Sequence, residues 1–597
     1  MAQAQPSSAQ RGSYEQLSGR VNTVALMVDN IKGTVTNTNT LAVGTSNAVN
    51  DMSRKLEELP PELAERVVSF MDRNDIAASF RRVCKAAAAQ FRGPEYTTIR
   101  LSQPVPAHAF AAHWLAPDAA RGLDLDHRRK LLCLVAATGV VANLEVALQA
   151  AGCTLAYDVL KAAAAAGKLA ACQWLLERGC PPEEYEGMGS DLLGVAAGAG
   201  HRHVCEWLLS LDLSWSERGD AAAARGGHVG LMEWLQLIRP PLMLEELFDD
   251  EALEGLKLQL VEGVAHGCDL PTLQRLWPGW GQLRPEAKAR ALAAAAGSPT
   301  PEWAAKVEWL EAQGAPRGAP AVAERAAALP DVEATARLAW LRGRGHPVDA
   351  AAVVATARAG NLAALEYLLT EAGVAPPAED DGTAAATAAA TAAAKAGHLA
   401  ALRALHAAGW QVDVILEVAA ARRGHLDVVM WLVEDRGPSA GEGWRSAHLF
   451  AVAAASGSVE LLAWLRERGC PWDGAAFKYG ASGGCVAALE WLAEGGCPMP
   501  DNGQPYTNAC RGGDLASIRC LARLGCPWGP AGKVIGEALI GRRSEVLPLL
   551  RCLLEAGCPV GDWANKSAEQ LKADLWPDRA QLVAPLLEAH RRRQRDP

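Results

Sequence analysis

The sequence predicts an all-α protein that is built mainly as a solenoid of stacked helix pairs. Three observations support this fold class. A frame of Gly, Trp-Leu and Gly recurs along most of the 597 residues, Ala-rich runs end at the first glycine of the frame, and Gly or Pro interrupts the apolar stretches at regular intervals. Units of this size cannot bury an apolar face alone, so neighbouring units are expected to share one continuous core.

The frame is anchored at the position that Trp174 occupies in GKLAACQWLLERGC. Leu follows the anchor in every unit except one, where Gly263 stands, and glycine is frequent seven residues before the anchor and five residues after it. Because glycine adopts the left-handed conformation that ends helices, each unit is predicted to be a pair of short helices. One gap of 47 residues leaves room for a further, degenerate unit. The fourteen anchors are residues 147, 174, 207, 234, 262, 309, 340, 367, 404, 431, 464, 491, 520 and 552.

The side chains of the frame predict how the pairs pack. The Ala-rich first helix can approach its neighbours closely, while the second helix presents Leu and Trp to the stack. The tryptophans at the anchors are therefore expected in the core, namely Trp174, Trp207, Trp234, Trp309, Trp340, Trp431, Trp464 and Trp491. The histidines of the recurring Gly-His pairs are expected to fill a structural position rather than bind metal, namely His201, His228, His398 and His425.

The fifteen cysteines are predicted to be reduced thiols, because none stands in a CxxC pair and the chain is far longer than a disulfide-stapled scaffold. Seven of them stand in Gly-Cys turns that recur with the units, where a small and weakly polar side chain can pack against the next unit. Redox sensing is the alternative role. The seven are Cys153, Cys180, Cys268, Cys470, Cys497, Cys526 and Cys558.

The segment AARRGHLDVVMWLVEDRG, Ala420 to Gly437, resembles the two helices of an ankyrin repeat, including the Gly-His pair that opens the second helix. The resemblance extends over residues 131–560 and implies an ankyrin-like α-solenoid that binds proteins. The sequence departs from that family in two ways. No TPLH turn is intact, and Gly-Cys-Pro replaces the closing Gly-Ala-Asp turn, while units of 27 residues are shorter than the usual ~33. The projecting β-turn that joins neighbouring ankyrin repeats is therefore expected to be shortened here.

A different pattern precedes the repeats. Pro60 and Pro61 open an expected amphipathic helix, residues 72–75 are expected to form a turn, and a second apolar stripe follows. The apolar side of the helix is expected to hold Leu63, Val67, Phe70 and Met71. Two or three short helices within residues 56–91 bury too little area to be stable with certainty on their own. Such a module is expected to need a partner surface.

This module resembles an F-box. The matching motifs are Leu59-Pro60, Glu62-Leu63, Val67-Val68, Ser69-Phe70-Met71, Asp75 and Val83-Cys84-Lys85, and Ala87 stands where the family has a final Trp. The resemblance implies docking on the Skp adaptor of a cullin-RING ubiquitin ligase, with the repeats holding a substrate protein. The alternative is an N-terminal cap of the solenoid. The resemblance assigns adaptor binding to Leu59, Pro60, Leu63, Val67, Phe70, Met71, Ile76, Val83 and Cys84.

The remaining segments complete the expected organisation. Residues 97–110 are expected to form a short strand and a proline-stiffened linker, and the Ala/Thr run of residues 383–395 is expected to lengthen one first helix. The expected regions are a polar, disordered or frayed tail at 1–54, the F-box-like module at 55–95, a linker and N-terminal cap at 96–130, the repeats at 131–560, and a C-terminal cap with a basic tail at 561–597.

Composition and motifs exclude several classes of function. The formal net charge of −10 is not that of a nucleic-acid binder, and no apolar stretch reaches the ~18 residues of a membrane span. No phosphate-binding loop, HExxH motif or metal-type cysteine pair is present, so we expect no catalytic residues, no metal and no cofactor. The acidic pairs at 124 and 126, 249–250 and 380–381 are interpreted as turn or surface residues.

These patterns favour a non-catalytic adaptor that recruits a protein for ubiquitination, in the cytoplasm or the nucleus. The first alternative is a repeat scaffold without ligase coupling. A sphingomyelinase-like phosphodiesterase is a remote second alternative, suggested only by ankyrin-rich chains grouped with such enzymes. Aromatic and Met side chains in the turns between units are the candidate partner contacts, namely Trp410, Trp472, Met499 and Trp528.

Overall fold

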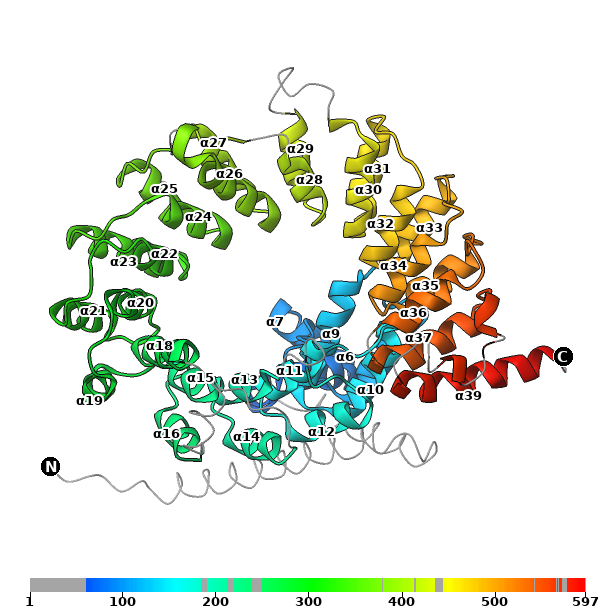
Figure 1. Cartoon of the computed structure of the whole chain (residues 1–597), viewed down its shortest axis with the longest axis horizontal. Coiled ribbons are helices and arrows are strands. Elements are labelled where there is room, and N and C mark those ends of the chain that lie inside the picture. Colours follow the sequence, from blue (N-terminus) through cyan, green and yellow to red (C-terminus); the bar gives the residue numbers. More distant parts are fainter. Residues whose placement is uncertain are drawn as a thin grey trace. The chain divides into compact units, whose positions relative to one another are not determined.

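The computed structural model describes residues 61–183, 190–211, 218–238, 250–377, 379–412, 415–434, 444–541, 543–564, 566, 569–571 and 577–595 (Figure 1). The chain forms two compact units. Unit 1 contains residues up to 119 together with 134–150, and unit 2 contains residues 120–133 together with 151–597. Both units are helical, and the described residues contain one isolated bridge, Cys153 with Asp514, in place of any strand.

Unit 1 holds the F-box-like module. Its helices are α3 (Pro61–Val68), α4 (Arg73–Asp75), the π-helical turn η1 (Ile76–Phe80), α5 (Arg81–Val83), α6 (Lys85–Gln90), α7 (Pro94–Thr97), α8 (Ala107–Trp114) and most of α10 (Val141–Ala151). The predicted turn at 72–75 is wrong in its position, because Asp72 precedes a helix that begins at Arg73 and continues to Val83.

The strand expected within residues 97–110 is absent. Helix α7 occupies residues 94–97, and the backbone that follows is bonded to one buried side chain, Asn74. The Asn74 amide nitrogen donates to the carbonyl oxygens of Arg100 (2.8 Å), Gln103 (3.1 Å) and Pro104 (2.9 Å), and its oxygen accepts from the Arg100 N–H (2.8 Å). A side chain thus satisfies polar groups that a neighbouring strand would otherwise have to satisfy.

Unit 2 is a stack of helix pairs, as the sequence predicts. Helix α9 (Leu125–Thr138) spans the boundary between the units. The first helices of the pairs are α11 (Tyr157–Ala165), α13 (Leu192–Gly198), α15 (Gly219–Arg225), α18 (Asp250–Gly267), α20 (Pro285–Ala296), α22 (Ala321–Ala327), α24 (Ala350–Ala359), α26 (Glu379–Ala396), α28 (Ile415–Ala421), α30 (Ala447–Ser456), α32 (Ala475–Gly483), α34 (Gln504–Arg511) and α36 (Lys533–Ile540).

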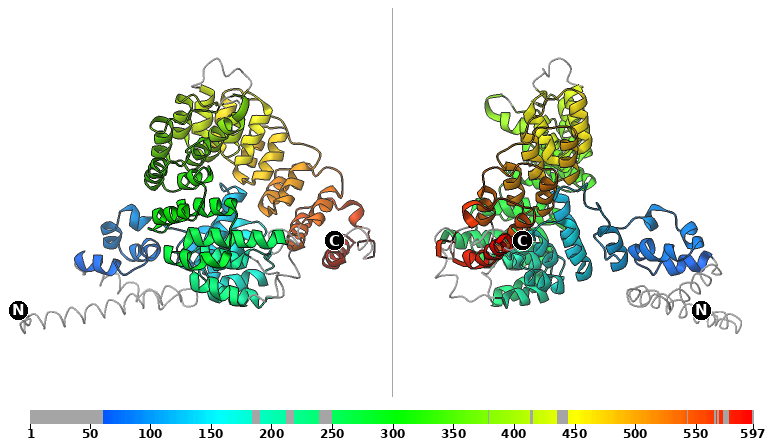
Figure 2. Two further views of the ribbon diagram at one scale, coloured as in Figure 1. Left: turned by 60° about the vertical axis from the view of Figure 1, so that its left-hand side comes forward. Right: turned by 90° about the vertical axis from the view of Figure 1, so that its right-hand side faces the viewer.

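The second helices form the other layer of the stack. They are α12 (Leu169–Glu177), α14 (Arg202–Leu209), α16 (Val229–Ile238), α19 (Leu270–Leu276), α21 (Trp303–Ala312), α23 (Asp331–Gly343), α25 (Leu362–Thr370), α27 (Leu399–Ala407), α29 (Leu426–Glu434), α31 (Val459–Glu467), α33 (Val486–Glu494), α35 (Leu515–Arg523) and α37 (Arg543–Glu555). Each first helix packs against the next first helix along the chain from α11 to α36. Figure 2 shows the successive pairs from two further directions. The 3-10 turns η2 (Trp277–Trp280) and η5 (Gly561–Ala564) and the C-terminal helix α39 (Pro577–Arg595) complete the unit.

Glycines end the helices where the frame places them. Gly200, Gly397 and Gly424 follow first helices with φ of 79°, 76° and 76°, and Gly179 and Gly469 follow second helices with φ of 80° and 77°. This left-handed conformation is strained for any side chain with a Cβ atom, which explains why the chain returns to glycine at these places. The predicted helix boundaries are confirmed there.

The core of unit 2 lies between the two layers. The Leu that follows the anchor is fully buried, as for Leu175, Leu310 and Leu432, and small Ala side chains of the first helices are buried beside it. The anchor tryptophans differ from the expectation. Trp431 and Trp464 are buried, whereas the other six are only half-buried, because they lie on the outer border of the second helix one position before the buried Leu.

The anchor at residue 262 is wrong. Residue 262 lies in α18, which packs between α15 and α20 and is therefore a first helix; its partner is α19. Glycine is needed at residue 263 for α18 to pack on α15, because an added Cβ atom there would overlap the Ala221 carbonyl oxygen of α15. The 47-residue gap between 262 and 309 contains the end of α18, its short second helix α19 and the next first helix α20, so residues 262–309 hold no further unit of the kind expected. The predicted long helix over the Ala/Thr run is confirmed as α26.

The Gly-His motif has a packing role. The His425 ring lies against Gly397 of the preceding unit, and its Nε2 is 3.0 Å from the Lys395 carbonyl oxygen. The His201 ring lies in the same way on Gly167, with Nε2 3.1 Å from the Ala165 carbonyl oxygen. We name the residue that follows the glycine the post-glycine position. Its side chain joins one helix pair to the end of the first helix of the preceding pair.

Two alanine substitutions separate backbone strain from this packing. We expect Gly397→Ala to lower the free energy of unfolding by about 2–4 kcal/mol, because the left-handed backbone becomes strained and the methyl group meets the His425 ring at 2.5 Å. Gly179→Ala is the matched control, since its φ is also positive but no atom lies within 4 Å of the added Cβ, and about 1–2 kcal/mol is expected. Urea denaturation followed by circular dichroism measures both, and equal losses would contradict the packing role.

Candidate functional site

Unit 1 exposes one large aromatic side chain just after α3. Phe70 is 78% exposed, and Leu63, Met71 and Val83 are half-buried. The other described members of the predicted adaptor-binding set are Val67, Ile76 and Cys84, which are buried in the core of the module itself. Leu59 and Pro60 lie outside the described residues. The structure therefore divides the predicted set into side chains that support the module and side chains that a partner can reach.

The module forms a core without the Trp of the F-box pattern. Ala87 is buried, and its N–H donates to the Cys84 sulfur at 3.3 Å, which caps α6. Phe91 packs edge-to-face on Phe80 (5.8 Å between ring centroids) and on Tyr96 (5.1 Å). Aromatic pairs of this geometry are favourable contacts, so they can supply apolar area that the missing Trp does not.

The four turn residues predicted as partner contacts are less accessible than expected. Trp410 is 2% exposed and belongs to the core, while Trp472, Met499 and Trp528 are half-buried. Trp528 stacks on Tyr506 at 3.7 Å between ring centroids, and Trp472 lies under the Arg466 guanidinium at 4.2 Å. Because these rings already contact other side chains of unit 2, they pack at the boundaries between neighbouring helix pairs.

A feature that the sequence reasoning missed lies on the second helices. Arginines stack on half-exposed anchor tryptophans four residues earlier, with Arg178 4.8 Å from the Trp174 ring and Arg344 5.0 Å from the Trp340 ring. Residues four apart lie on one helix face, so the Trp-x-x-x-Arg spacing was the available signal. Each exposed contact of this kind contributes roughly 0.5–1 kcal/mol.

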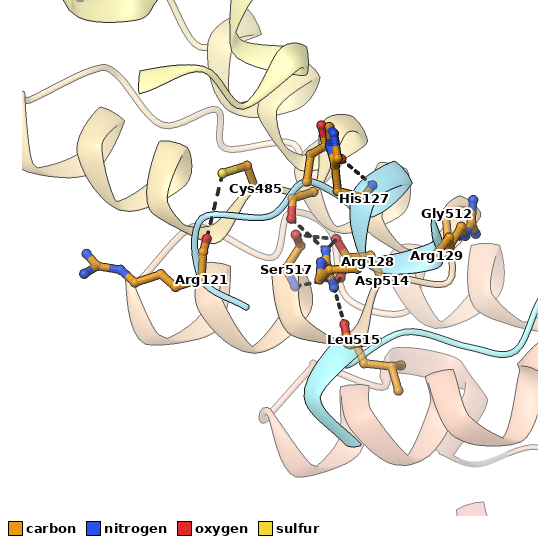
Figure 3. A network of polar contacts seen from close by, with 12 residues as sticks. Arg121, His127, Arg128, Arg129, Cys485, Gly512, Asp514, Leu515 and Ser517 are labelled. Carbon is orange, nitrogen blue, oxygen red and sulfur yellow. Dashed lines mark hydrogen bonds and ion pairs between the residues drawn. The ribbon is translucent and has the colours of Figure 1, made fainter. Parts of the chain in front are cut away.

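The polar network of Figure 3 lies where the first residues of unit 2 meet residues more than 350 positions later. Arg128 and Asp514 form a buried ion pair, with side chains 1% and 0% exposed. Arg128 Nη1 donates to Asp514 Oδ1 (2.9 Å) and to the Ala151 carbonyl oxygen (2.6 Å), and Nη2 donates to Asp514 Oδ2 (2.7 Å) and to the Gly484 carbonyl oxygen (2.7 Å). Burial alone would lower the pKa of Arg128, but the charge and hydrogen bonds of Asp514 raise it above its ordinary value.

Asp514 occupies a post-glycine position, directly after Gly513, and packs on Gly484 of the preceding unit. An ionised carboxylate accepts hydrogen bonds but cannot donate one to a carbonyl oxygen as His does. Arg128 supplies that donor, since it binds both Asp514 and the Gly484 carbonyl oxygen. Asp514 also caps α35, because it accepts from the Ser517 N–H (3.1 Å) and hydroxyl (2.6 Å).

Residues 120–133, which we name the edge segment, lie along the ends of α30, α32 and α34. The Ala487 N–H donates to the Arg121 carbonyl oxygen (3.1 Å), and Arg129 donates to the Gly512 carbonyl oxygen (2.7 Å). Arg121 and Arg523 both pair with Glu490, and although burial acts to raise the pKa of Glu490, these two arginines lower it. Contacts within unit 2 therefore run from the edge segment through the successive helix pairs and return to the edge segment. We name this the closed circuit of contacts.

The cysteines are suited to packing rather than to thiol chemistry. Fourteen of the fifteen are buried, and only Cys133 is partly exposed. The thiols of Cys180 and Cys470 donate to carbonyl oxygens of Ala156 (3.3 Å) and Ser446 (3.4 Å), 24 residues earlier in both cases. Burial raises the pKa of Cys172 to about 12. These contacts favour the packing role over redox sensing.

The described residues offer little to bind a metal or cross a bilayer. Among them, no group of three or more His, Cys, Asp or Glu side chains is arranged to hold a metal ion. Asp124, one of the predicted acidic pair with Asp126, accepts from the His127 backbone N–H (2.7 Å) at the start of α9. No helix in the same ranges has the length and apolar character needed to span a membrane.

Comparisons with known proteins leave the family open. No protein-family model matches the chain, and no curated protein matches it. Among solved structures, the crystal structure of the pentatricopeptide repeat protein PPR10 from maize is similar, with 12% sequence identity, 88% of this chain and 78% of that chain covered, and a TM-score of 0.26. The all-helical repeat architecture rests on the helix pairs described above.

Substitution of Arg128 tests the buried ion pair. We expect Arg128→Met to lower the free energy of unfolding by about 3–5 kcal/mol, because it leaves the Asp514 carboxylate buried without its cation. The double variant Arg128→Met with Asp514→Leu is expected to recover part of that loss. Arg592→Met, in an exposed ion pair with Glu588, is the control and should cost less than about 1 kcal/mol. Equal losses for the two single variants in urea denaturation would contradict this account.

Thiol reactivity tests the role of the cysteines. Since burial raises the pKa of Cys268 and Cys526 to about 11, compared with an ordinary value of 9.0, the thiolate fraction at pH 8 is roughly 100-fold smaller in the folded state. Ellman's reagent is therefore expected to label the native protein slowly and the protein in urea rapidly. Rapid labelling of several native thiols would favour redox sensing instead.

Proposed function

We propose that this protein is a non-catalytic binding scaffold, in which unit 1 docks on a Skp-type adaptor of a cullin-RING ubiquitin ligase and unit 2 holds a substrate protein. The observation that carries the proposal is Phe70. It is a large aromatic side chain, 78% exposed at the end of α3, and Leu63 and Met71 in the same module are partly exposed. An exposed aromatic residue next to a complete core is typical of a partner contact.

The order of motifs around Phe70 supports the same proposal. In the F-box pattern Ser-Phe-Leu comes after Leu-Pro, Glu-Leu and a hydrophobic pair, and Ser69-Phe70-Met71 stands in that order here, directly after α3. The Ser69 hydroxyl donates to the Arg66 carbonyl oxygen (2.7 Å), which fixes the turn that presents Phe70. A preformed turn lowers the conformational entropy lost on binding.

The second candidate is a scaffold without ligase coupling, and a specific observation favours it. Val67, Ile76 and Cys84, which the resemblance assigns to adaptor binding, point into the core of the module. A module that uses these side chains for its own stability has a smaller surface left for a partner. The two candidates differ in whether the wild-type protein binds the adaptor.

Binding to purified Skp adaptor distinguishes the two candidates. We expect wild-type protein to bind and Phe70→Asp to weaken binding by about 30-fold or more, because a charge replaces a central aromatic contact. The fold should survive, since the side chain is exposed. Val332→Asp, at an 85% exposed apolar position in unit 2, is the matched control and should bind like wild type. Isothermal titration calorimetry measures the affinities, and absence of binding by wild-type protein would leave the scaffold without ligase coupling.

A further inference from the structure

Unit 2 carries a row of basic side chains along one edge. The first helices all end at the edge where the post-glycine positions lie, and their last turns are repeatedly basic. The cations of α22, α24, α26 and α28 follow one another on adjacent first helices. One more cation lies on α15, beyond α18, whose last turn holds His266, and α20, whose last turn holds no basic residue. We name them the edge cations. They are Arg225 in α15, Arg325 in α22, Arg358 in α24, Lys395 in α26 and Arg422 directly after α28.

The edge cations are exposed and have no acidic partner. All five side chains are accessible to solvent, and none of them forms an ion pair with another described residue. Other exposed cations of unit 2 behave differently. Arg202 pairs with Glu206 and Arg511 pairs with Glu537. The chain as a whole has a net charge of −10, so an unpaired basic row stands out from its general charge.

Helix capping does not account for the row. Cations are favourable near helix C-termini, where carbonyl groups lack intrahelical partners. Here other side chains bind those carbonyl oxygens. Asn361 donates to the carbonyl oxygen of Ala327 (3.0 Å), the last residue of α22, and the His425 ring lies 3.0 Å from the Lys395 carbonyl oxygen in α26. The buried Lys306 ammonium donates to Ala265 O (2.8 Å) in α18. The edge cations are therefore left available.

Like charges lie close to one another along this edge. The pKa of His266, in the last turn of α18, is lowered to about 4, mainly by burial and in addition by the positive charges of Arg225, Lys306 and Arg325. Positive charges that repel one another across neighbouring units gain from a bound anion, because it reduces that repulsion as well as pairing with each cation.

The same edge already holds a polypeptide further along the stack. The edge segment runs past the post-glycine positions of α30 to α34, with the Asp124 Cβ atom 3.5 Å from the Cβ position of Gly457 and Leu125 against Gly484. Its second acidic residue, Asp126, lies 3.9 Å from Arg423, the neighbour of the edge cation Arg422. A polypeptide segment of this chain thus lies beside the end of the row of edge cations, with the Asp126 carboxylate at that point.

We propose that the edge cations of α22 to α28 bind an extended acidic polypeptide segment of a partner protein. Neighbouring helices lie about 8–10 Å apart, and three residues of an extended chain span about 10 Å, so an acidic side chain at every third position matches the one cation that each of these four first helices contributes. The edge segment shows how the edge accommodates a polypeptide, which favours a peptide over a nucleic acid. This inference names the class of partner for the scaffold function of unit 2 and is independent of ligase docking by unit 1.

Fluorescence anisotropy with the full chain tests the proposal. The probe is a labelled peptide with glutamate at every third position and Gly and Ser between. Binding is expected at low salt and should weaken as NaCl is raised, because exposed ion pairs are screened. Lys395→Glu with Arg422→Glu is expected to weaken binding by about tenfold or more. The matched control is Arg519→Glu with Arg551→Glu, which reverses two exposed cations of the second helices α35 and α37 and should leave binding unchanged.

The outcomes separate this inference from its alternatives. No binding of the peptide, or equal weakening by both double variants with unchanged circular dichroism, would overturn it. Tighter binding of a single-stranded RNA of equal charge, weakened by Lys395→Glu with Arg422→Glu, would assign the edge to nucleic acid instead. Phe70→Asp should bind the peptide like wild type, so failure of ligase docking and failure of this inference are distinguishable.

Discussion

The contact on which unit 2 depends is the packing of each post-glycine side chain on the glycine that ends the preceding first helix. The glycine must adopt a positive φ, and the space above it must be free of a Cβ atom, because a ring or carboxylate of the next unit fills that space. His201, His398 and His425 all pack in this way. This contact recurs between helix pairs. It fixes the residue at which a first helix ends and the distance from that helix to the next first helix.

The Arg128–Asp514 pair is a variant of this contact. A carboxylate in the post-glycine position cannot bind the carbonyl oxygen of Gly484, so a cation from the start of the unit completes the arrangement. A buried ion pair adds little net stability compared with an apolar contact. It permits few other arrangements of the chain, because a buried charge without its partner strongly lowers the free energy of unfolding. It therefore specifies where the edge segment lies more than it strengthens the stack.

The sequence predicts the repeated parts of this fold well and the unique parts poorly. Helix pairs and their glycines follow from local periodicity, which tertiary contacts do not override here. The anchor at 262 fails because Glu262-Gly263 stands there in place of Trp-Leu, and the expected strand fails because the Asn74 side chain bonds to the backbone of that segment. The depth of Trp410 and the exposure of Phe70 depend on packing between distant segments. The pairing of Arg128 with Asp514 joins residues 386 positions apart, and only the acidic post-glycine residue gave a signal of it.

The closed circuit of contacts has a consequence for how this chain can change its length. An open array of repeats gains or loses a unit at little cost, because each unit meets only its immediate neighbours. In unit 2 the edge segment must reach Gly484 and Gly512 at the far end of the same array. Duplicating or deleting one pair between them would displace those acceptors by one helix spacing and leave a buried arginine without its carboxylate. The copy number of the repeats is thereby coupled to the closing contacts, and evolution must alter both together.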